Sequence, residues 1–171
     1  ITSVTRDALA DGGAGHVGAS VEAIRAISPS ILVEVLVPDF GGKTELFDLV
    51  LDSKPAVIGH NVETVSRLSP LVRDRRTSYR QSLEMLRYCS KRNPNTKSAI
   101  LLGLGEEEDE ISSTLQDLRD AGVSHLALGQ YLAPGRQNVP VARWVHPDEF
   151  ERWKERAIEL GFKSCASGPF G

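Results

Sequence analysis

The sequence predicts an α/β fold built on a parallel β-sheet, and three observations lead to that prediction. Short apolar runs rich in β-branched residues alternate with amphipathic stretches along the 171 residues, which is the pattern of repeated βα units. The runs are followed by glycine or by clusters of polar residues, as strand ends commonly are. The composition, 40% hydrophobic and 25% charged, is typical of a globular chain.

Five strands are expected. The chain opens with residues 1–4, which read as the end of a strand without its beginning, so we expect a fragment of a longer protein. The continuous run over residues 31–37, closed by Pro38, is short and β-branched and therefore predicts a buried strand. Shorter runs of the same kind occupy residues 56–60, 99–102 and 125–128.

Apolar residues at helical spacing predict helices between and after these strands. Ser78 followed by Gln81 is a capping box that marks a helix start. Pro147 begins the last helix and Gly161 ends it. No repeat or linker is visible, so we expect a single domain over residues 1–171, with a long loop at 132–144. The apolar faces are Val17, Val21, Ile24 and Ile27; Leu83 and Leu86; Ile111, Leu115, Leu118 and Ala121; and Phe150, Trp153, Ala157 and Leu160.

Composition excludes several classes of function. A net charge of −3 and a pI near 5.8 give no electrostatic basis for binding nucleic acid. No stretch approaches eighteen consecutive apolar residues, so no membrane span is expected. The two cysteines, Cys89 and Cys165, lie far apart and outside any ligand motif, so no metal ligand is expected and each is interpreted as a small buried residue of a protein in a reducing compartment.

Polar residues gather where the predicted strands end. In parallel α/β sheets the carboxyl ends of the strands share one rim, which is where such folds bind ligands. The residues concerned are Thr2, Ser3, Arg6 and Asp7 after the first strand; Asp39 after the second; His60, Asn61 and Glu63 after the third; Gly103, Gly105 and Glu106 after the fourth; and Gln130 and Tyr131 after the fifth.

Structural explanations exist for several of these residues. The Asp11-Gly12-Gly13 sequence alone predicts a turn. Residues 106–110 are most simply the acidic first turn of a helix, and His60 alone could be a hydrogen-bonded core residue. No phosphate-binding loop motif and no G-x-S-x-G motif is present, which disfavours a nucleotide-phosphate site and a serine hydrolase.

Several longer strings together resemble the lipoyl synthase family of the radical S-adenosylmethionine (SAM) enzymes. The resemblance covers essentially the whole chain and keeps the order of the family's motifs. The matching strings are Ile1 to Val4 with Arg6-Asp7 and residues 11–16, Val33 to Phe40, His60 to Val65, Tyr79 with Ser82-Leu83, Lys97 to Glu106, Leu128 to Leu132, and Ala166 to Pro169.

This resemblance implies a partial TIM-type (βα) barrel of the radical SAM kind. It also implies an enzyme, a sulfurtransferase that inserts two sulfur atoms into a protein-bound octanoyl chain to form the lipoyl cofactor. The implied cofactors are SAM and two four-iron four-sulfur clusters. The cysteine motifs that hold the clusters would precede Ile1, and a serine ligand would follow Gly171, so none is ligated by this chain and the chain alone is expected to be inactive.

Residue roles follow from the resemblance. Thr2, Ser3, Asn61, Glu63 and Lys97 are expected to face SAM, because hydroxyl, amide and carboxylate groups can hold its ribose and amino group and a lysine can meet its carboxylate. The backbone around Gly103 would flank the adenine, and Gln130 and Tyr131 would border the substrate channel. Alternatively, Lys97 is a solvated charge at a strand start, and Asn61 and Glu63 cap a loop.

The implied partners are an octanoylated carrier domain, either the E2 subunit of a 2-oxoacid dehydrogenase or the H protein of the glycine cleavage system, and an electron donor such as ferredoxin or flavodoxin. The implied location is the bacterial cytoplasm, or the mitochondrion or plastid in a eukaryote. The sequence departs from the family pattern at Ala8, Gly41, Ala99, Ala133, Gln137 and Asn138, which bears on the carrier-facing surface.

Two other functions remain open on this reading. One is another radical SAM enzyme that inserts sulfur or functionalises a C–H bond on a different substrate. The other is a non-catalytic module that binds lipoyl-carrier domains.

Overall fold

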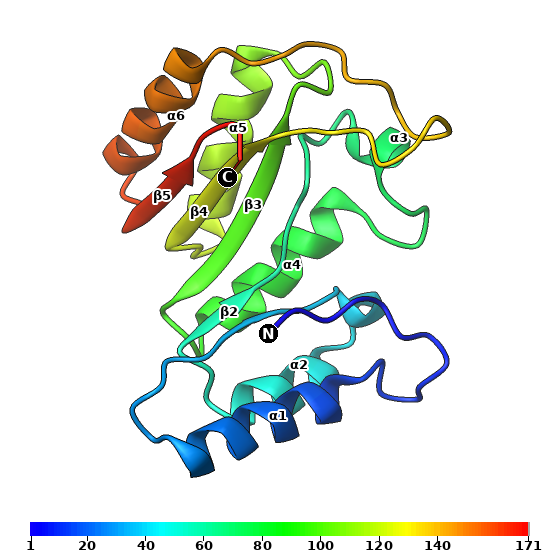
Figure 1. The fold of residues 1–171 in the computed structure, drawn as a ribbon, viewed down its shortest axis with the longest axis vertical. Helices are drawn as coiled ribbons and strands as arrows, with labels where there is room; N and C mark the ends of the chain where they lie inside the picture. The colour runs from blue at the N-terminus through cyan, green and yellow to red at the C-terminus, as the bar shows by residue number, and fades with distance from the viewer. Residues whose placement is uncertain (171) are drawn as a thin grey trace.

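The protein forms one parallel β-sheet with helices packed against it (Figure 1). The structure is a computed structural model and describes residues 1–170. The five strands lie side by side in the order of the chain, and every neighbouring pair is parallel. This confirms the predicted α/β class, and the curved sheet is part of a (βα) barrel. The strands are β1 (Glu34–Leu36), β2 (Val57–Gly59), β3 (Thr96–Leu102), β4 (His125–Gln130) and β5 (Ser164–Ser167).

The helices cover one face of this sheet (Figure 1). Parallel neighbours joined in sequence need right-handed crossovers, which place every connecting helix on the same side. No helix formed by residues 1–170 lies over the opposite face. The helices are α1 (Ala14–Ile27), the 3₁₀ turn η1 (Phe40–Gly42), α2 (Thr44–Asp52), α3 (Ser69–Val72), α4 (Tyr79–Ser90), α5 (Glu108–Asp120) and α6 (Pro147–Glu159).

The core lies between the sheet and the helices, in two clusters. One is centred on Val35, Ile58 and Phe47 near α1 and α2, and the other on residues of β3 to β5 with α5 and α6. Along β3 every second residue is buried against the helices, and the residues between them are half-buried on the open face. Burial alternates from one residue to the next because successive side chains of a strand point to opposite faces and only one face is covered.

The strands differ from expectation in two places. Residues 1–4 contribute only an isolated parallel bridge, between Thr2 and Leu36, instead of a full strand. The fifth strand of the sheet is β5, which the sequence analysis did not predict. Only Cys165 of its four residues is buried, so the segment carries too little apolar character to be recognised as a strand.

The predicted faces of α5 and α6 are confirmed, because Ile111, Leu115 and Phe150 are almost fully buried. Cys89 and Cys165 are buried free thiols, as expected. The face assigned to α1 was wrong at its end, because Ile27 is 86% exposed. The helices α2 and α3 were not predicted. None of the helices within residues 1–170 is both long enough and apolar enough to cross a lipid bilayer.

Ser78 caps α4 as expected, since its hydroxyl accepts a hydrogen bond of 3.1 Å from the Gln81 backbone N–H. The Gln81 side chain does not return to the cap, however. It donates to Asp39 at 2.7 Å, and so ties α4 to the loop after β1.

Candidate functional site

A pocket of about 290 Å³ opens at the carboxyl ends of β1 and β2, beside the N-terminal segment. Three of the predicted site residues, Ser3, Asn61 and Glu63, line it together. His60 and Arg73 contribute two further polar side chains. The pocket therefore combines hydroxyl, amide, carboxylate and guanidinium groups within one small volume.

Glu63 is held in the pocket by a strained turn. Its φ is +67°, and the Thr64 N–H donates to the Val62 carbonyl at 2.8 Å, which makes Glu63 the central residue of a three-residue turn. Parallel pairing with β3 continues around the turn, since the Glu63 N–H donates to the Ala99 carbonyl at 3.1 Å. A non-glycine residue in such a conformation is maintained only when its surroundings impose it.

Burial raises the pKa of the Glu63 carboxyl, although the Asn61 side chain and the charge of Arg73 act in the opposite direction. The carboxylate is thus only partly compensated by its protein neighbours. A ligand that donated hydrogen bonds to it would complete its coordination.

A chain of hydrogen bonds connects the partly buried Arg73, which lines the pocket, to the buried His60. Its Nη1 donates to Ser82 Oγ at 2.8 Å, and Ser82 Oγ lies 2.8 Å from His60 Nε2. The other ring nitrogen, Nδ1, lies 3.0 Å from the Val37 carbonyl, which can only accept. Nδ1 therefore carries the proton, Nε2 accepts from Ser82, and the imidazole is neutral. Burial lowers the pKa of His60 accordingly.

His60 was considered either a rim residue or a core histidine, and it is both buried and at the edge of the pocket. Arg73 was not singled out from the sequence. It stands among Arg75 and Arg76, and nothing in the local pattern separates a partly buried arginine from two others nearby. Burial lowers the pKa of Arg73, while Glu63 and Asp39 raise it.

A second pocket, of about 380 Å³, adjoins the first. Four residues line both: Thr5, Pro38, Asp39 and Thr77. We call the first the rim pocket and the second the side pocket.

The expected turn at residues 11–13 stands at the start of α1, where Asp11 accepts hydrogen bonds from the backbone N–H groups of Gly13 and Gly15 at 2.9 and 3.0 Å.

Thr2 and Lys97 do not line the rim pocket, and β1 and β2 lie between them. Thr2 pairs with Leu36, Leu36 with Gly59, and Gly59 with Lys97, so their backbones are at one level of the sheet. The Lys97 ammonium lies 2.7 Å from the Glu34 carboxylate, on the open face. Because β2 lies between the strands of Glu34 and Lys97, this ion pair spans one intervening strand.

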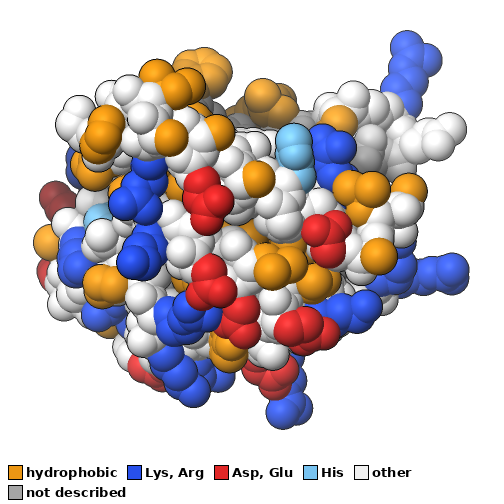
Figure 2. Space-filling view, turned by 90° about the horizontal axis from the view of Figure 1, so that it is seen from below, with side chains coloured by type: hydrophobic (Ala, Val, Ile, Leu, Met, Phe, Trp, Pro, Cys, Tyr) orange, Lys and Arg blue, Asp and Glu red, His pale blue; other side chains and the backbone are white. Residues whose placement is uncertain are grey.

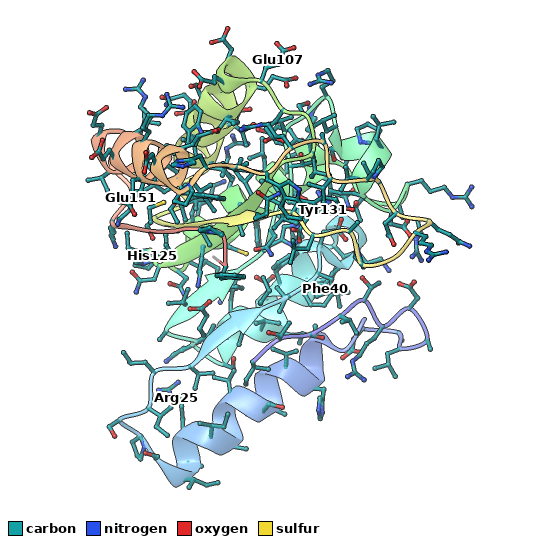
Figure 3. The ribbon with its side chains drawn as sticks, turned by 45° about the horizontal axis from the view of Figure 1, so that its top comes forward. Arg25, Phe40, Glu107, His125, Tyr131 and Glu151 are labelled. Carbon is teal, nitrogen blue, oxygen red and sulfur yellow. The ribbon has the colours of Figure 1, made fainter. Side chains whose placement is uncertain are left out.

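Gly103, Gln130 and Tyr131 form a separate group around the loop after β4. The Gln130 amide donates to the carbonyls of Tyr131 and Arg143 at 3.0 and 3.2 Å, and its oxygen accepts from the Val145 N–H at 2.9 Å. A Cβ on Gly103 would lie 2.6 Å from the backbone carbonyl oxygen of Arg143 and would also collide with the Gln130 amide, so this glycine is required by packing. In Figure 3 Tyr131 lies by the loop that follows β4, while Phe40 lies nearer the N-terminal segment.

Glu106 has a role that the sequence did not reveal. It precedes α5, which begins at Glu108, and its side chain is fully buried. It accepts hydrogen bonds from the backbone N–H groups of Gly103 and Leu104 at 2.7 and 2.8 Å. The acidic residues of the first helical turn are Glu108, Asp109 and Glu110, so the interpretation of Glu106 as one of them was wrong.

No three His, Cys, Asp or Glu side chains among residues 1–170 come together as a metal site would require. Burial raises the pKa of the Cys89 thiol to about 12 and that of the Cys165 thiol to about 11, so both remain protonated at neutral pH. The described residues therefore do not fit an iron–sulfur cluster.

Comparison with protein families identifies the chain more closely. The model of the radical SAM superfamily matches residues 1–118. The chain belongs to the radical SAM superfamily.

Relatives of this radical SAM chain carry the name mitochondrial lipoyl synthase. This chain is 51% identical over 172 residues to the lipoyl synthase of Trypanosoma brucei gambiense. It is 49% identical over 171 residues to that of Drosophila melanogaster. Each alignment covers 99% of this chain, but only 42% of the trypanosome protein and 45% of the fly protein. The chain thus spans less than half the length of these relatives.

Proposed function

We propose that this radical SAM chain is part of a lipoyl synthase, a sulfurtransferase that inserts two sulfur atoms into a protein-bound octanoyl chain to form the lipoyl cofactor. The observation that carries the proposal is identity of about one half to lipoyl synthases along 99% of the chain. We also propose that residues 1–171 form a single partial barrel domain.

The rim pocket suits SAM by the chemistry of its lining. Glu63 and Asn61 offer acceptors and donors for ribose hydroxyls or an amino group, and Ser3 adds a hydroxyl. The guanidinium of Arg73 can meet a carboxylate. Bound SAM would supply a 5′-deoxyadenosyl radical. These side chains would orient the SAM molecule and exclude water from it.

The remaining predicted contacts stay part of this proposal. In this proposal Thr2 and Lys97 contact SAM from beside the rim pocket, and Lys97 exchanges Glu34 for the carboxylate of the ligand. The pairing of Thr2 with Leu36 and of Lys97 with Gly59 supports this. Gly103 would contribute backbone near the adenine. Gln130 and Tyr131 would act through the loop that they hold, which borders the substrate channel in this proposal.

The proposal also includes two four-iron four-sulfur clusters in the complete protein. In this proposal the cluster ligands lie outside residues 1–170, among which no three His, Cys, Asp or Glu side chains come together. The proposed partners are an octanoylated carrier domain and a small electron-transfer protein such as ferredoxin or flavodoxin. The names of the relatives support a mitochondrial location in a eukaryote, and a bacterial cytoplasmic location remains the expectation for a bacterial source.

Reconstitution of the full-length protein tests the function. After treatment with iron and sulfide, it is incubated with SAM, a reductant and a short octanoyl-lysine peptide. We expect release of 5′-deoxyadenosine and a peptide mass increase matching two added sulfur atoms. 5′-Deoxyadenosine without sulfur insertion would favour another radical SAM reaction. Carrier binding without SAM cleavage would favour a non-catalytic module.

A variant pair tests the rim pocket in the same assay. Asn61→Ala removes a pocket side chain, and we expect it to raise the KM for SAM about tenfold, the effect of losing one or two hydrogen bonds. Glu22→Ala on the exposed side of α1 is the matched control and should leave the KM unchanged. An unchanged KM in Asn61→Ala would remove Asn61 from the proposed site.

A further inference from the structure

Arg73 is a cation of the rim pocket without a counter-ion. Within residues 1–170 it forms no ion pair, and its one side-chain hydrogen bond is the 2.8 Å bond to Ser82 Oγ. Figure 2 shows acidic and basic side chains interspersed on the surface over α1 and α2. Water hydrates such surface charges, whereas Arg73 is partly buried and depends on its neighbours. A bound anionic group would supply the partner that the described residues leave out.

The charges of the rim pocket suit a ligand that is cationic overall and carries one carboxylate. Asp39 and Glu63 bring two carboxyl groups into the lining, against the single guanidinium of Arg73. SAM has a sulfonium and an ammonium group against one carboxylate, so the formal charges are complementary. Within residues 1–170 Arg73 is the only lysine or arginine in the lining. Lys97 stands outside it and would have to leave Glu34 to reach the same carboxylate.

The bond between Arg73 and Ser82 depends on the state of His60. A guanidinium can only donate, so the Ser82 oxygen accepts there and the hydroxyl proton needs another acceptor. His60 Nε2, 2.8 Å away, is that acceptor, because Nδ1 carries the ring proton at the Val37 carbonyl. The direction of every bond in the chain is thus fixed, with one acceptor for each proton.

Ser82 and His60 are held by regular structure, whereas Arg73 is not. Ser82 is fully buried near the start of α4, where its N–H donates to the Ser78 carbonyl at 3.0 Å. His60 follows β2 directly, and its N–H donates to the Lys97 carbonyl at 3.1 Å. Arg73 follows the single turn of α3 and has a long side chain with many rotamers. The fixed pair can therefore restrict the flexible guanidinium.

We propose that Ser82 and a neutral His60 are positioning residues, which hold the guanidinium of Arg73 in the orientation that binds the carboxylate of SAM. This inference rests on the proposed function and adds two residues that act through Arg73. Without the Ser82 hydroxyl, Arg73 is free to turn away from the pocket. A proton on His60 Nε2 would bring a second donor and a second positive charge to the same hydroxyl oxygen.

Equilibrium dialysis of the full-length reconstituted protein with SAM and with decarboxylated SAM tests the inference. The second ligand keeps the sulfonium, the amino group and the ribose but lacks the carboxylate. We expect Arg73→Gln to raise the Kd for SAM about tenfold and Ser82→Ala to raise it about fivefold. Both variants should leave the Kd for decarboxylated SAM unchanged. Arg75→Gln, at an exposed position outside the pocket lining, is the matched control and should alter neither Kd.

A double-mutant cycle shows whether Ser82 acts through Arg73. Added to Arg73→Gln, Ser82→Ala should cost no further SAM affinity, because the guanidinium that it positions is already gone. Ser113→Ala, which removes an exposed hydroxyl bonded to the Asp109 carbonyl one turn earlier in α5, is the matched control. An equal loss in both backgrounds would overturn the inference, and so would an equal loss with both ligands.

Two substitutions test His60, and they decide the inference if Ser82→Ala does not fold. His60→Gln keeps an oxygen that can accept the Ser82 proton, whereas His60→Leu has no acceptor. We expect His60→Leu to raise the Kd for SAM about threefold and His60→Gln to raise it less, with decarboxylated SAM unaffected. Equal SAM affinity in the two variants would overturn the role of His60. An unchanged SAM Kd in Arg73→Gln would overturn the whole inference, whereas failure of the wild-type protein to bind SAM would refute the proposed function.

Discussion

At the scale of single residues, Glu63 shows how a local cost can mark a functional group. The chain accepts a positive φ at a charged residue and buries its carboxyl, although either feature alone lowers stability. Hydrogen bonds donated by a bound ligand would offset the free energy lost through strain and through burial of the carboxylate.

The variants Glu63→Gly and Glu63→Ala separate strain from charge. Both remove the carboxylate, but only glycine is at ease with a φ of +67°. In the full-length protein we expect Glu63→Gly to be more stable than Glu63→Ala by about 1 kcal/mol, and both to lose SAM affinity to the same extent. Urea unfolding and SAM titration measure the two effects. Equal stability of the variants would show that the turn is unstrained.

The buried imidazole of His60, bonded to Ser82 and the Val37 carbonyl, predicts a dependence of stability on pH. The folded protein resists protonating His60, whose pKa lies below its ordinary value of 6.5, whereas the unfolded chain binds the proton. Stability should therefore fall as the pH drops below about 6.5, by up to about 1.4 kcal/mol per pH unit.

Unfolding of the wild type and of His60→Gln between pH 7.5 and 5.5 measures this contribution. The stability advantage of the wild type over His60→Gln should shrink across that range. His16→Gln, at an exposed position on α1, serves as the control and should leave the pH profile of the wild type intact. A parallel decline of wild type and His60→Gln would contradict the prediction.

At the scale of elements, the loop from Tyr131 to His146 depends on a few buried contacts. The Gln130 side chain fastens it at three backbone groups, and the hydroxyl of Tyr131 donates to the Val139 carbonyl at 2.8 Å. Gly103 gives Gln130 the space to do so. The loop has no regular structure of its own, so its position depends on these contacts.

Gly103→Ala should release this loop. The new Cβ would lie 2.6 Å from the Arg143 carbonyl and would also sit at a φ of +101°. We expect a loss of at least about 2 kcal/mol and faster proteolytic cleavage between residues 132 and 144. Gly135→Ala in the same loop is the control, since its nearest neighbour would be 3.4 Å away. Equal cleavage rates in the two variants would contradict this role of Gly103.

The elements that the sequence predicted well are those whose apolar pattern is long. The faces of α5 and α6 follow from four residues each at helical spacing, and β3 and β4 from apolar runs. By contrast, β5 has four residues of which one is buried, and the apolar Ile27 at the end of α1 is exposed. Short elements carry too few residues for a period to be recognised.

The site was predictable to a similar degree. From the rule that ligands bind at the carboxyl ends of parallel strands, Ser3, Asn61 and Glu63 were predicted to lie together. All three line the rim pocket. It could not predict side-chain direction, and so it did not foresee that Gln130 would be occupied with backbone groups. Arg73 was missed because its position depends on contacts with Ser82 from another element.

At the scale of the whole molecule, the helices formed by residues 1–170 cover one face of the sheet. The other face presents half-buried side chains along β3 and β4, among them Lys97, Ala99 and Ala127. The small side chains of Ala99 and Ala127 leave room for a ligand or for packing of further chain against the sheet. Five strands are also too few to close a barrel, which leaves unpaired backbone groups at the edges of the sheet.

These features predict the behaviour of residues 1–171 expressed alone. The open face and the sheet edges should make this chain less stable than the full-length protein and prone to associate as its concentration rises. Thermal unfolding and light scattering over a range of concentrations measure both properties. Incubated with iron, sulfide, SAM and a reductant, it should release no 5′-deoxyadenosine, because residues 1–170 hold no cluster site. A monomer with one cooperative transition would contradict the first expectation, and release of 5′-deoxyadenosine the second.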